Sequence, residues 1–268
     1  MPHLVFEKQD GIAHVTLNRP EKKNAMSPEM VIQLAEAWMD VQNDPEIRVA
    51  LLTSAGDSAF CAGADLGRLI TLITRAREPE DAWDQAFVAN RKIMNTALMR
   101  NTDMCTPIVA AIQGPALAGG LEILLNVDIR IASTEATFGL TEVRRGLIPA
   151  GGSLARLARQ IGHAAAMEIV LGGEPISAQD AYRMGVVNRL VEPDALTETA
   201  LDWAHKIAQG SPLALRKAKE ALIRSTGENL QTAFAIEDDC ARVVFRSEDA
   251  REGPRAFMER REPRFTGR

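Results

Sequence analysis

Two glutamates are the residues of this sequence whose type and position best suit chemistry. Glu122 lies in the run Gly119-Gly-Leu-Glu-Ile-Leu-Leu125, where almost every neighbour is apolar, so its carboxyl group is expected to be buried. Burial penalises the charge of a carboxyl group, which is then held neutral or given a defined partner. Glu142 ends the segment Phe138-Gly-Leu-Thr-Glu142. Two such groups suit the general acid and general base steps of a reaction beside an activated carbonyl.

Two turns built from small residues supply the second half of such a site. They are Ala62-Gly-Ala-Asp65 and Ala118-Gly-Gly-Leu121, and each follows an expected strand and opens an expected helix. Backbone N–H groups from two such turns can converge as an oxyanion hole, and losing one donor costs about 3–4 kcal/mol of transition-state stabilisation. Gly119 and Gly120 let the backbone approach a ligand at a helix start, which favours negative charge. The sequence therefore predicts carbonyl chemistry between these turns.

Each of these features also has a simpler structural interpretation. Ala-Gly runs are common at helix starts, so one turn alone is weak evidence for a site. Glu142 could form an ion pair with Arg144 or Arg145, and Glu122 could be paired with Arg130 or lie at a subunit interface. Spacing along the chain does not show that the two carboxyl groups face each other, so both interpretations stay open at this point.

The sequence lacks the motifs of several other chemistries. Ser153 follows two glycines but does not lie in a Gly-x-Ser-x-Gly motif, so it is predicted to cap a helix. No Walker A or Gly-x-Gly-x-x-Gly motif occurs, and no metal site is expected, because the histidines lack ligand spacing. Arg19, Lys22 and Lys23 are predicted to form a solvated loop, with contact to a phosphorylated cofactor tail as the lesser alternative. The histidines are His3, His14, His163 and His205.

The composition is that of a globular protein without nucleic-acid or membrane partners. Of 268 residues, 46% are hydrophobic and 25% are charged, and a net charge of −5 without any basic block argues against nucleic-acid binding. The three widely spaced cysteines offer neither a disulfide framework nor a metal knuckle. The sequence shows no signal-peptide pattern and no apolar run of about 18 residues, so a cytoplasmic protein is expected.

Strands, glycine-rich turns and helices recur along the chain, which predicts an α/β fold of parallel strands covered by helices. Asp10-Gly11 marks a hairpin between strands at 3–8 and 12–17, and Ser27-Pro28 begins a helix over 29–43. Further strands are expected at 48–53, 107–112, 128–132 and 185–191, and further helices at 154–161, 164–171 and 177–184.

Two segments differ from this pattern. Residues 67–103 are charged and expected to be helical, with an exposed break at 75–81, and they suggest a lid. Residues 194–260 are expected to form three amphipathic helices, followed by a frayed, arginine-rich end. The chain is therefore divided into a core at 1–193 and a C-terminal helical region at 194–268.

In combination, the motifs resemble the crotonase superfamily of enoyl-CoA hydratases and isomerases. The resemblance covers nearly the whole chain and implies a spiral of repeated ββα units, with a C-terminal helical region that assembles homotrimers, often as dimers of trimers. The matching segments are LNRPEKKNAM (17–26), FCAGADL (60–66), PIVAAIQGPALAGGLEILLNVDIRIAS (107–133), FGLTEVRRGLIPAGG (138–152), AYRMGVVNRLV (181–191) and SEDAREGPRAFMERREP (247–263).

The resemblance also implies roles for individual residues. The substrate would be an acyl-CoA thioester whose carbonyl is held by the N–H groups of Ala64 and Gly119. Glu122 would help to deprotonate a water for attack at Cβ of a 2-trans-enoyl-CoA, and Glu142 would deliver the proton to Cα. No metal or redox cofactor is needed. The substrate and its CoA would contact Lys22, Asn24, Ala25, Ala62, Asp65, Leu66 and Gly120.

Three positions depart from the family's pattern. Ala118 replaces a frequent glycine, Gly67 stands where a lysine or arginine is frequent, and Ala150 stands where many hydratases carry glycine beside the acyl pocket. These changes leave the length and branching of the acyl group open. An enoyl-CoA isomerase or a specialised acyl-CoA dehydratase is the alternative function, and a non-catalytic acyl-CoA-binding protein is a third. Because both glutamates are retained, a hydratase is favoured.

Overall fold

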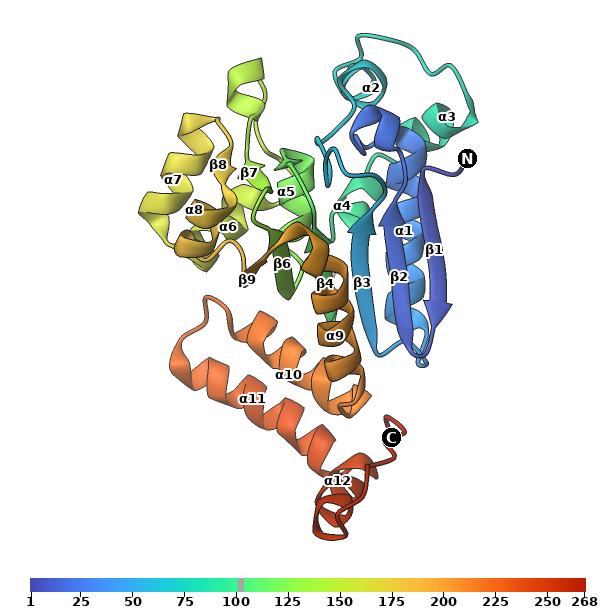
Figure 1. Ribbon diagram of the computed structural model, residues 1–268, viewed down its shortest axis with the longest axis vertical. Helices are drawn as coiled ribbons and strands as arrows, with labels where there is room; N and C mark the ends of the chain where they lie inside the picture. The colour runs from blue at the N-terminus through green and yellow to red at the C-terminus, as the bar shows by residue number, and fades with distance from the viewer. Residues whose placement is uncertain (101–103) are drawn as a thin grey trace.

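The computed structural model describes residues 1–100 and 104–268, which contain a six-stranded and a three-stranded sheet (Figure 1). The larger sheet has the strand order β1-β2-β3-β4-β6-β9. Its first two strands pair antiparallel and the rest run parallel, which confirms the predicted α/β class. These strands are β1 (Leu4–Gln9), β2 (Ile12–Leu17), β3 (Val49–Ser54), β4 (Ile108–Ile112), β6 (Ile129–Ser133) and β9 (Arg189–Val191).

The first elements form where the local sequence predicts them. Asp10 and Gly11 have φ values of 51° and 78°, the left-handed conformation that a tight hairpin turn requires. After the short helix η1 (Pro20–Lys22), α1 (Pro28–Asn43) begins with the side chain of Ser27 accepting a hydrogen bond from the N–H of Met30. The hairpin and the first helix are thus confirmed.

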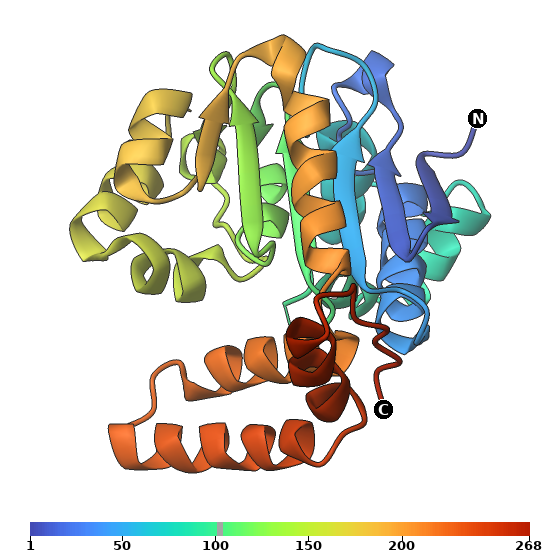
Figure 2. The same ribbon diagram turned by 60° about the horizontal axis from the view of Figure 1, so that its bottom comes forward.

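Alternating side chains bury both faces of the large sheet. In β3, Ala50 and Leu52 belong to the core on the face covered by α1, whereas Val49 and Leu51 pack on the opposite face with α9 (Leu196–Ala208). Figure 2 shows α9 lying across that face. Because successive side chains of a strand point to opposite faces, a nearly continuous apolar strand is what a sheet covered on both sides needs.

The small sheet positions the turns that precede the two glutamates. Its strands are β5 (Ala116–Leu117), β7 (Thr137–Gly139) and β8 (Ile176–Ser177), and β5 pairs parallel with β7 so that Leu117 lies opposite Gly139. The buried helix α5 (Gly119–Leu124) leaves β5, and the short helix η3 (Glu142–Arg145) follows β7. Two neighbouring strands therefore lead directly to Glu122 and Glu142.

Three predicted helices after Gly152 are present as α6 (Ser153–Ile161), α7 (His163–Gly172) and α8 (Ala178–Met184). The strand predicted at 185–191 is shorter than expected and begins at Arg189. The N–H groups of Val186 and Val187 donate to the carbonyl of Ala181, so these residues close the end of α8 instead of extending the strand.

The segment predicted as a lid is broken into short helices. They are the π-helix η2 (Leu66–Ile70), α2 (Thr71–Ile73), α3 (Ala82–Ala89) and α4 (Ile93–Ala97). The predicted exposed break is partly wrong, because Arg77 pairs at 2.5 Å with the fully buried carboxylate of Asp84, which Arg68 also contacts at 3.1 Å. Residues 101–103 of the predicted segment lie outside the described residues, and a lid role stays a prediction.

The C-terminal region contains α9, preceded by the short helix η4 (Pro193–Ala195), and then α10 (Pro212–Ser225), α11 (Leu230–Phe245) and α12 (Asp249–Met258). A fourth helix, α12, thus lies in the segment where three were predicted. The predicted frayed end is wrong as well. The Asp249 carboxylate accepts hydrogen bonds from the N–H groups of Thr266 (2.8 Å) and Gly267 (3.0 Å), which ties down the last residues. A boundary after residue 193 stays a prediction; α9, which follows it, packs on the sheet.

No helix within the described residues is long and apolar enough to cross a membrane.

Candidate active site

The two small-residue turns lie against each other because a short parallel bridge joins them. Cys61 pairs with Ala116: its N–H donates to the carbonyl of Pro115 at 3.0 Å, and its carbonyl accepts from the N–H of Leu117 at 2.9 Å. Gly120 packs on this bridge so closely that an added Cβ would lie 2.3 Å from the Cys61 carbonyl oxygen. Only glycine fits at that position, which explains the second glycine of the turn.

The backbone N–H groups of Ala64 and Gly119 lie close to each other. An ideal Cβ built on Gly119 would lie 3.8 Å from the Ala64 nitrogen, and one built on Gly63 would lie 3.3 Å from the Gly119 nitrogen. Within the described residues, no protein acceptor takes either of these two N–H groups. Unpaired N–H groups at neighbouring turns are the donors that an oxyanion hole requires.

Ala118 connects β5 to α5 in a conformation that disfavours a side chain. Its φ is 50° and its ψ is −123°, in a region that is essentially limited to glycine. The N–H of Ala118 donates to the carbonyl of Gly139 at 2.8 Å, which fixes the turn against β7. The departure noted in the sequence is therefore a strained residue beside the candidate donors.

Glu122 is held by the start of α6. One carboxylate oxygen, Oε1, accepts hydrogen bonds from the N–H of Gly151 at 2.6 Å and the hydroxyl of Ser153 at 2.8 Å. The residue is only 5% exposed, and burial raises the pKa of its carboxyl group, while the hydrogen bonds from Ser153 and Gly151 oppose that rise. The two hydrogen bonds to one oxygen thus favour the ionised form of Glu122, whereas burial disfavours it.

Glu142 lies in a less supported environment at the first residue of η3. Its Oε2 is buried and has no hydrogen-bond partner among the described residues. Burial and, to a smaller degree, the negative charge of Glu122 raise the pKa of the Glu142 carboxyl to about 7, against a hydrogen bond from its own N–H and the charge of Arg145. The two carboxyl groups are thus close enough to influence each other, as the prediction of a shared site requires.

The alternative ion pairs considered for the two glutamates are not formed. Arg144 pairs with Glu174 at 2.7 Å, and Arg145 donates to the carbonyl of Thr141 at 2.9 Å. Arg130 donates to Gln160 at 3.0 Å. The prediction that Ser153 caps its own helix is wrong: no side chain of the N-cap residue caps α6, and the Ser153 hydroxyl bonds to Glu122 instead.

The predicted CoA-binding residues come from two loops that lie side by side. Met26 bridges Ala64, and the N–H of Ala62 donates to the carbonyl of Lys23 at 3.0 Å. Lys22 is exposed at the surface, Ala25 is half-buried, and Leu66 is 54% exposed. The two predicted loops therefore lie side by side, and their residues differ in how far they are exposed.

Three polar residues of these loops hold the backbone. Asn24 is fully buried and donates to the carbonyls of Ala55 and Ala59, both at 3.0 Å, so its side chain is occupied within the protein. Arg19 is 8% exposed and pairs with Asp65 at 2.6 Å. Asp65 also accepts from the first N–H groups of η2. The prediction that Arg19 is solvated is wrong.

Sequence reasoning missed Gly151 and Ser153 as partners of Glu122. The signal was present as the Gly151-Gly152-Ser153 helix start, but the sequence did not show which carboxylate the N-terminal donors of α6 would meet. An added Cβ on Gly151 would lie 2.5 Å from Glu122 Oε2, so glycine is needed there as well. No cluster of possible metal ligands occurs in the part of the chain that the structure describes.

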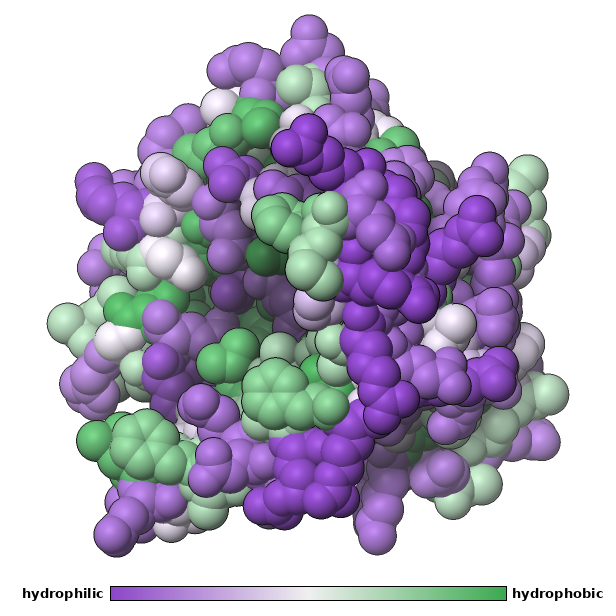
Figure 3. All heavy atoms as spheres, turned by 90° about the horizontal axis from the view of Figure 1, so that it is seen from below, coloured by the Kyte–Doolittle hydropathy of each residue, from purple (hydrophilic) through white to green (hydrophobic). Residues whose placement is uncertain are grey.

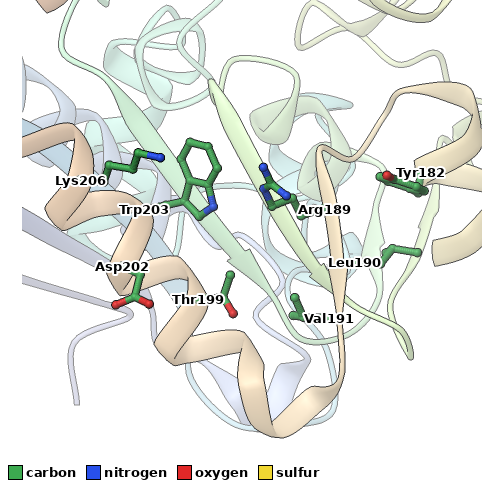
Figure 4. A pocket seen from close by; sticks show the side chains of 8 residues that line it. All are labelled: Tyr182, Arg189, Leu190, Val191, Thr199, Asp202, Trp203 and Lys206. Atoms are coloured by element: carbon green, nitrogen blue, oxygen red, sulfur yellow. The ribbon is translucent and has the colours of Figure 1, made fainter.

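A separate hollow lies outside this arrangement. Figure 4 shows it between α9 and β9, with Trp203 flanked by Arg189 and Lys206, whose cationic groups lie 4.9 and 5.2 Å from the indole ring. Neither candidate acid and neither candidate oxyanion donor lines this hollow, which has a volume of about 460 Å³. We therefore locate the candidate chemistry at the two turns and the paired glutamates.

Comparison with known proteins agrees with this geometry. Residues 7–268 match the family model described as enoyl-CoA hydratase/isomerase. The chain is 39% identical to the (E)-benzylidenesuccinyl-CoA hydratase of Thauera aromatica, over 98% of this chain and 99% of that protein. It is 30% identical to the crotonyl-CoA hydratase of Syntrophomonas wolfei, over 98% and 97%.

Solved structures show the same fold. The crystal structure of an enoyl-CoA hydratase from Bacillus anthracis is 33% identical and superposes with a TM-score of 0.88, covering 99% of this chain and 100% of that one. An enoyl-CoA hydratase from Mycobacterium tuberculosis is 36% identical, with a TM-score of 0.86 and full coverage of both chains. Sequence and fold together show that this chain belongs to the enoyl-CoA hydratase/isomerase family, the crotonase superfamily.

Proposed function

We propose that this protein is a hydro-lyase that adds water across the double bond of 2-trans-enoyl-CoA thioesters to give 3-hydroxyacyl-CoA. The observation that carries the proposal is the pair of neighbouring carboxyl groups, Glu122 and Glu142, with different hydrogen-bond support. Full-length relatives at 30–38% identity are named as enoyl-CoA and crotonyl-CoA hydratases.

In this proposal, the thioester carbonyl oxygen accepts hydrogen bonds from the N–H groups of Ala64 and Gly119. Both groups lack protein acceptors within the described residues, so they are available to a ligand without breaking a native bond. As water attacks Cβ, negative charge moves onto the thioester oxygen. Fixed donors stabilise this enolate more than they stabilise the neutral substrate, which lowers the barrier.

The two acids divide the proton transfers. Glu122, ionised and held by two donors, takes a proton from water as the oxygen bonds to Cβ. Glu142, whose pKa is raised to about 7, is the better proton donor near neutral pH and delivers its proton to Cα. One proton leaves water and one reaches carbon, so the cycle closes when Glu122 returns its proton to Glu142 through solvent. No metal or redox cofactor enters these steps.

The CoA portion is proposed to lie along the two adjoining loops, over Lys22, Ala25, Ala62, Asp65, Leu66 and Gly120. Lys22 is exposed and offers a positive charge to a phosphate. Asn24 and the carboxylate of Asp65 are occupied by the loop itself. We expect Asn24 to act by fixing the loop and not by direct contact with the substrate.

We further propose a homotrimer or a dimer of trimers and a cytoplasmic location. Viewed from the end formed by α10–α12, apolar side chains interrupt the hydrophilic surface (Figure 3). Apolar residues exposed on these helices need cover, and a second copy of the chain would supply it. These residues are Leu222, Ile223, Leu230, Phe234, Val243, Phe245, Phe257 and Met258.

The function is tested by following the absorbance of the conjugated thioester of crotonyl-CoA and identifying the product. We expect 3-hydroxybutyryl-CoA, and we expect Glu122→Gln and Glu142→Gln each to remove nearly all hydration. Unchanged turnover in either variant would rule out the role given to that residue. A shifted double bond without a hydroxyacyl product would favour the alternative, an enoyl-CoA isomerase.

A further inference from the structure

The start of α6 contacts a carboxylate that belongs to another part of the chain. A helix of this length leaves its first N–H groups without partners, and a side chain at the N-cap normally accepts one of them. Here Gly152 occupies the N-cap and offers no side chain, with a φ of 115°. Glu122 reaches in from α5 and accepts from the Gly151 N–H, just before the helix, and from the hydroxyl of Ser153, its first residue. The helix start is therefore built to receive this one carboxylate.

All of this support falls on one oxygen of Glu122. Oε1 accepts both hydrogen bonds, whereas no donor among the described residues bonds to Oε2. The carboxyl group also packs closely against Gly151. A Cβ added to that glycine would lie 2.5 Å from Oε2 and equally close to a methyl carbon of Leu98. One oxygen is thus bound to the protein, and the other is left for a ligand.

The Ser153 side chain interacts mainly with Glu122. It is fully buried, and its hydroxyl makes a single hydrogen bond to protein, the one to Glu122 at 2.8 Å. A buried hydroxyl needs a partner, yet an alanine in this place would satisfy packing without one. A hydroxyl that donates to an ionised carboxylate makes the stronger class of hydrogen bond, so this contact favours the ionised form of Glu122.

We propose that Ser153 is a positioning residue for hydration: its hydroxyl and the Gly151 N–H fix Oε1 of Glu122, so that Oε2 is the oxygen that takes the proton from water. This inference rests on the proposed function and deepens it. It assigns the base to Oε2, and it makes Ser153, which binds the other oxygen, a residue that orients the carboxylate without touching the substrate.

The test is the pH dependence of kcat/KM for crotonyl-CoA hydration in Ser153→Ala. Loss of the hydroxyl makes the ionised form of Glu122 harder to reach, so kcat/KM should fall about tenfold on the acidic side of the profile. The acidic limb should move to higher pH, while the alkaline limb keeps its place. KM should change little, because Ser153 belongs to α6 and to neither of the proposed CoA loops. Ser153→Thr, which keeps a hydroxyl, should restore the acidic limb.

Ser177→Ala is the matched control. This substitution removes a hydroxyl at another helix start: the Ser177 oxygen caps α8 by accepting from the N–H of Asp180 at 3.1 Å, and it contacts neither acid. Its substitution should lower thermal stability without moving either limb. A Ser153→Ala profile with unmoved limbs would overturn the inference even if wild-type hydration is intact. Absence of hydration by the wild-type protein would instead overturn the proposed function.

Discussion

Glu122 and Glu142 are the same residue type in two different environments. Glu122 is the more buried of the two, yet one of its oxygens accepts two hydrogen bonds from the start of α6. Glu142 is half-buried, and its Oε2 has no partner among the described residues. Burial raises the pKa of both carboxyl groups. At Glu122, hydrogen bonds from Ser153 and Gly151 oppose that rise. At Glu142, only its own N–H and the charge of Arg145 oppose it. Hydrogen-bond support, more than depth, separates a base from an acid here.

Replacing either acid should give the largest effect on activity. Glu122→Gln and Glu142→Gln each keep the shape of the side chain and remove its proton chemistry, so each should lower kcat by about 10²–10⁴-fold. Steady-state hydration of crotonyl-CoA measures this loss. Circular dichroism of each variant should match the wild type, since both changes are nearly isosteric. A variant with more than half of the wild-type kcat would contradict the assigned role.

Removing one candidate oxyanion donor should be nearly as severe. Ala64→Pro deletes an N–H that bonds to nothing within the described part of the protein, so kcat should fall about 10²–10³-fold. The neighbouring bonds from Met26 N–H to the Gly63 carbonyl and from Asp65 N–H to the Met26 carbonyl do not involve the deleted group. Thermal melting should confirm that the variant folds. A folded variant with normal kcat would place the hole elsewhere.

Adding one methyl group at Gly151 should disturb Glu122 and the adjoining Leu98 side chain. Gly151→Ala would place a Cβ 2.5 Å from Glu122 Oε2, so the carboxyl group must move, and hydration should fall at least tenfold. Gly172→Ala is the control, because nothing lies within 4 Å of its added Cβ and its φ is not positive. It should retain wild-type activity. Equal activity in both variants would show that the Glu122 position is not critical.

The pH profile should report Glu142 directly. A carboxyl group with a pKa raised to about 7 is protonated below that pH and ionised above it, so the proton donor is lost as pH rises. The value of kcat/KM should therefore fall about tenfold per pH unit once the pH exceeds the Glu142 pKa of about 7. Measurements between pH 5 and 9 would test this. A profile that stays flat to high pH would exclude Glu142 as the acid.

The smallest effect is expected at Ala118, and on stability. Its φ of 50° is costly for alanine, so Ala118→Gly should relieve strain and raise the free energy of unfolding by about 1 kcal/mol. Urea unfolding followed by circular dichroism can resolve that difference. A destabilised variant would show that the Ala118 methyl group packs usefully.

Much of the fold followed from local patterns, because those patterns act over short distances. The hairpin at Asp10-Gly11 and the start of α1 at Ser27 depend on their own neighbours, and both were correctly predicted. The family resemblance and the pairing of the two turns with the glutamates also came from the sequence. What could not be predicted depends on which distant groups meet.

Ser153 shows this limit best. Its position after two glycines indicated a helix start, but the partner of its hydroxyl lies on α5, 31 positions earlier in the chain. Arg19 was likewise predicted to be solvated, since its half-buried partner Asp65 belongs to a separate loop. The end of the chain looked frayed because the sequence did not show that Asp249 would bind its last residues.

The most direct test is a crystal structure of the protein with 3-hydroxybutyryl-CoA, the product of hydrating crotonyl-CoA. The account predicts that the thioester oxygen lies within hydrogen-bond distance of the Ala64 and Gly119 nitrogens. It also predicts that the product hydroxyl contacts Oε2 of Glu122 and that Glu142 faces Cα. A thioester bound elsewhere, or one with its acyl carbons turned away from both carboxyl groups, would contradict it.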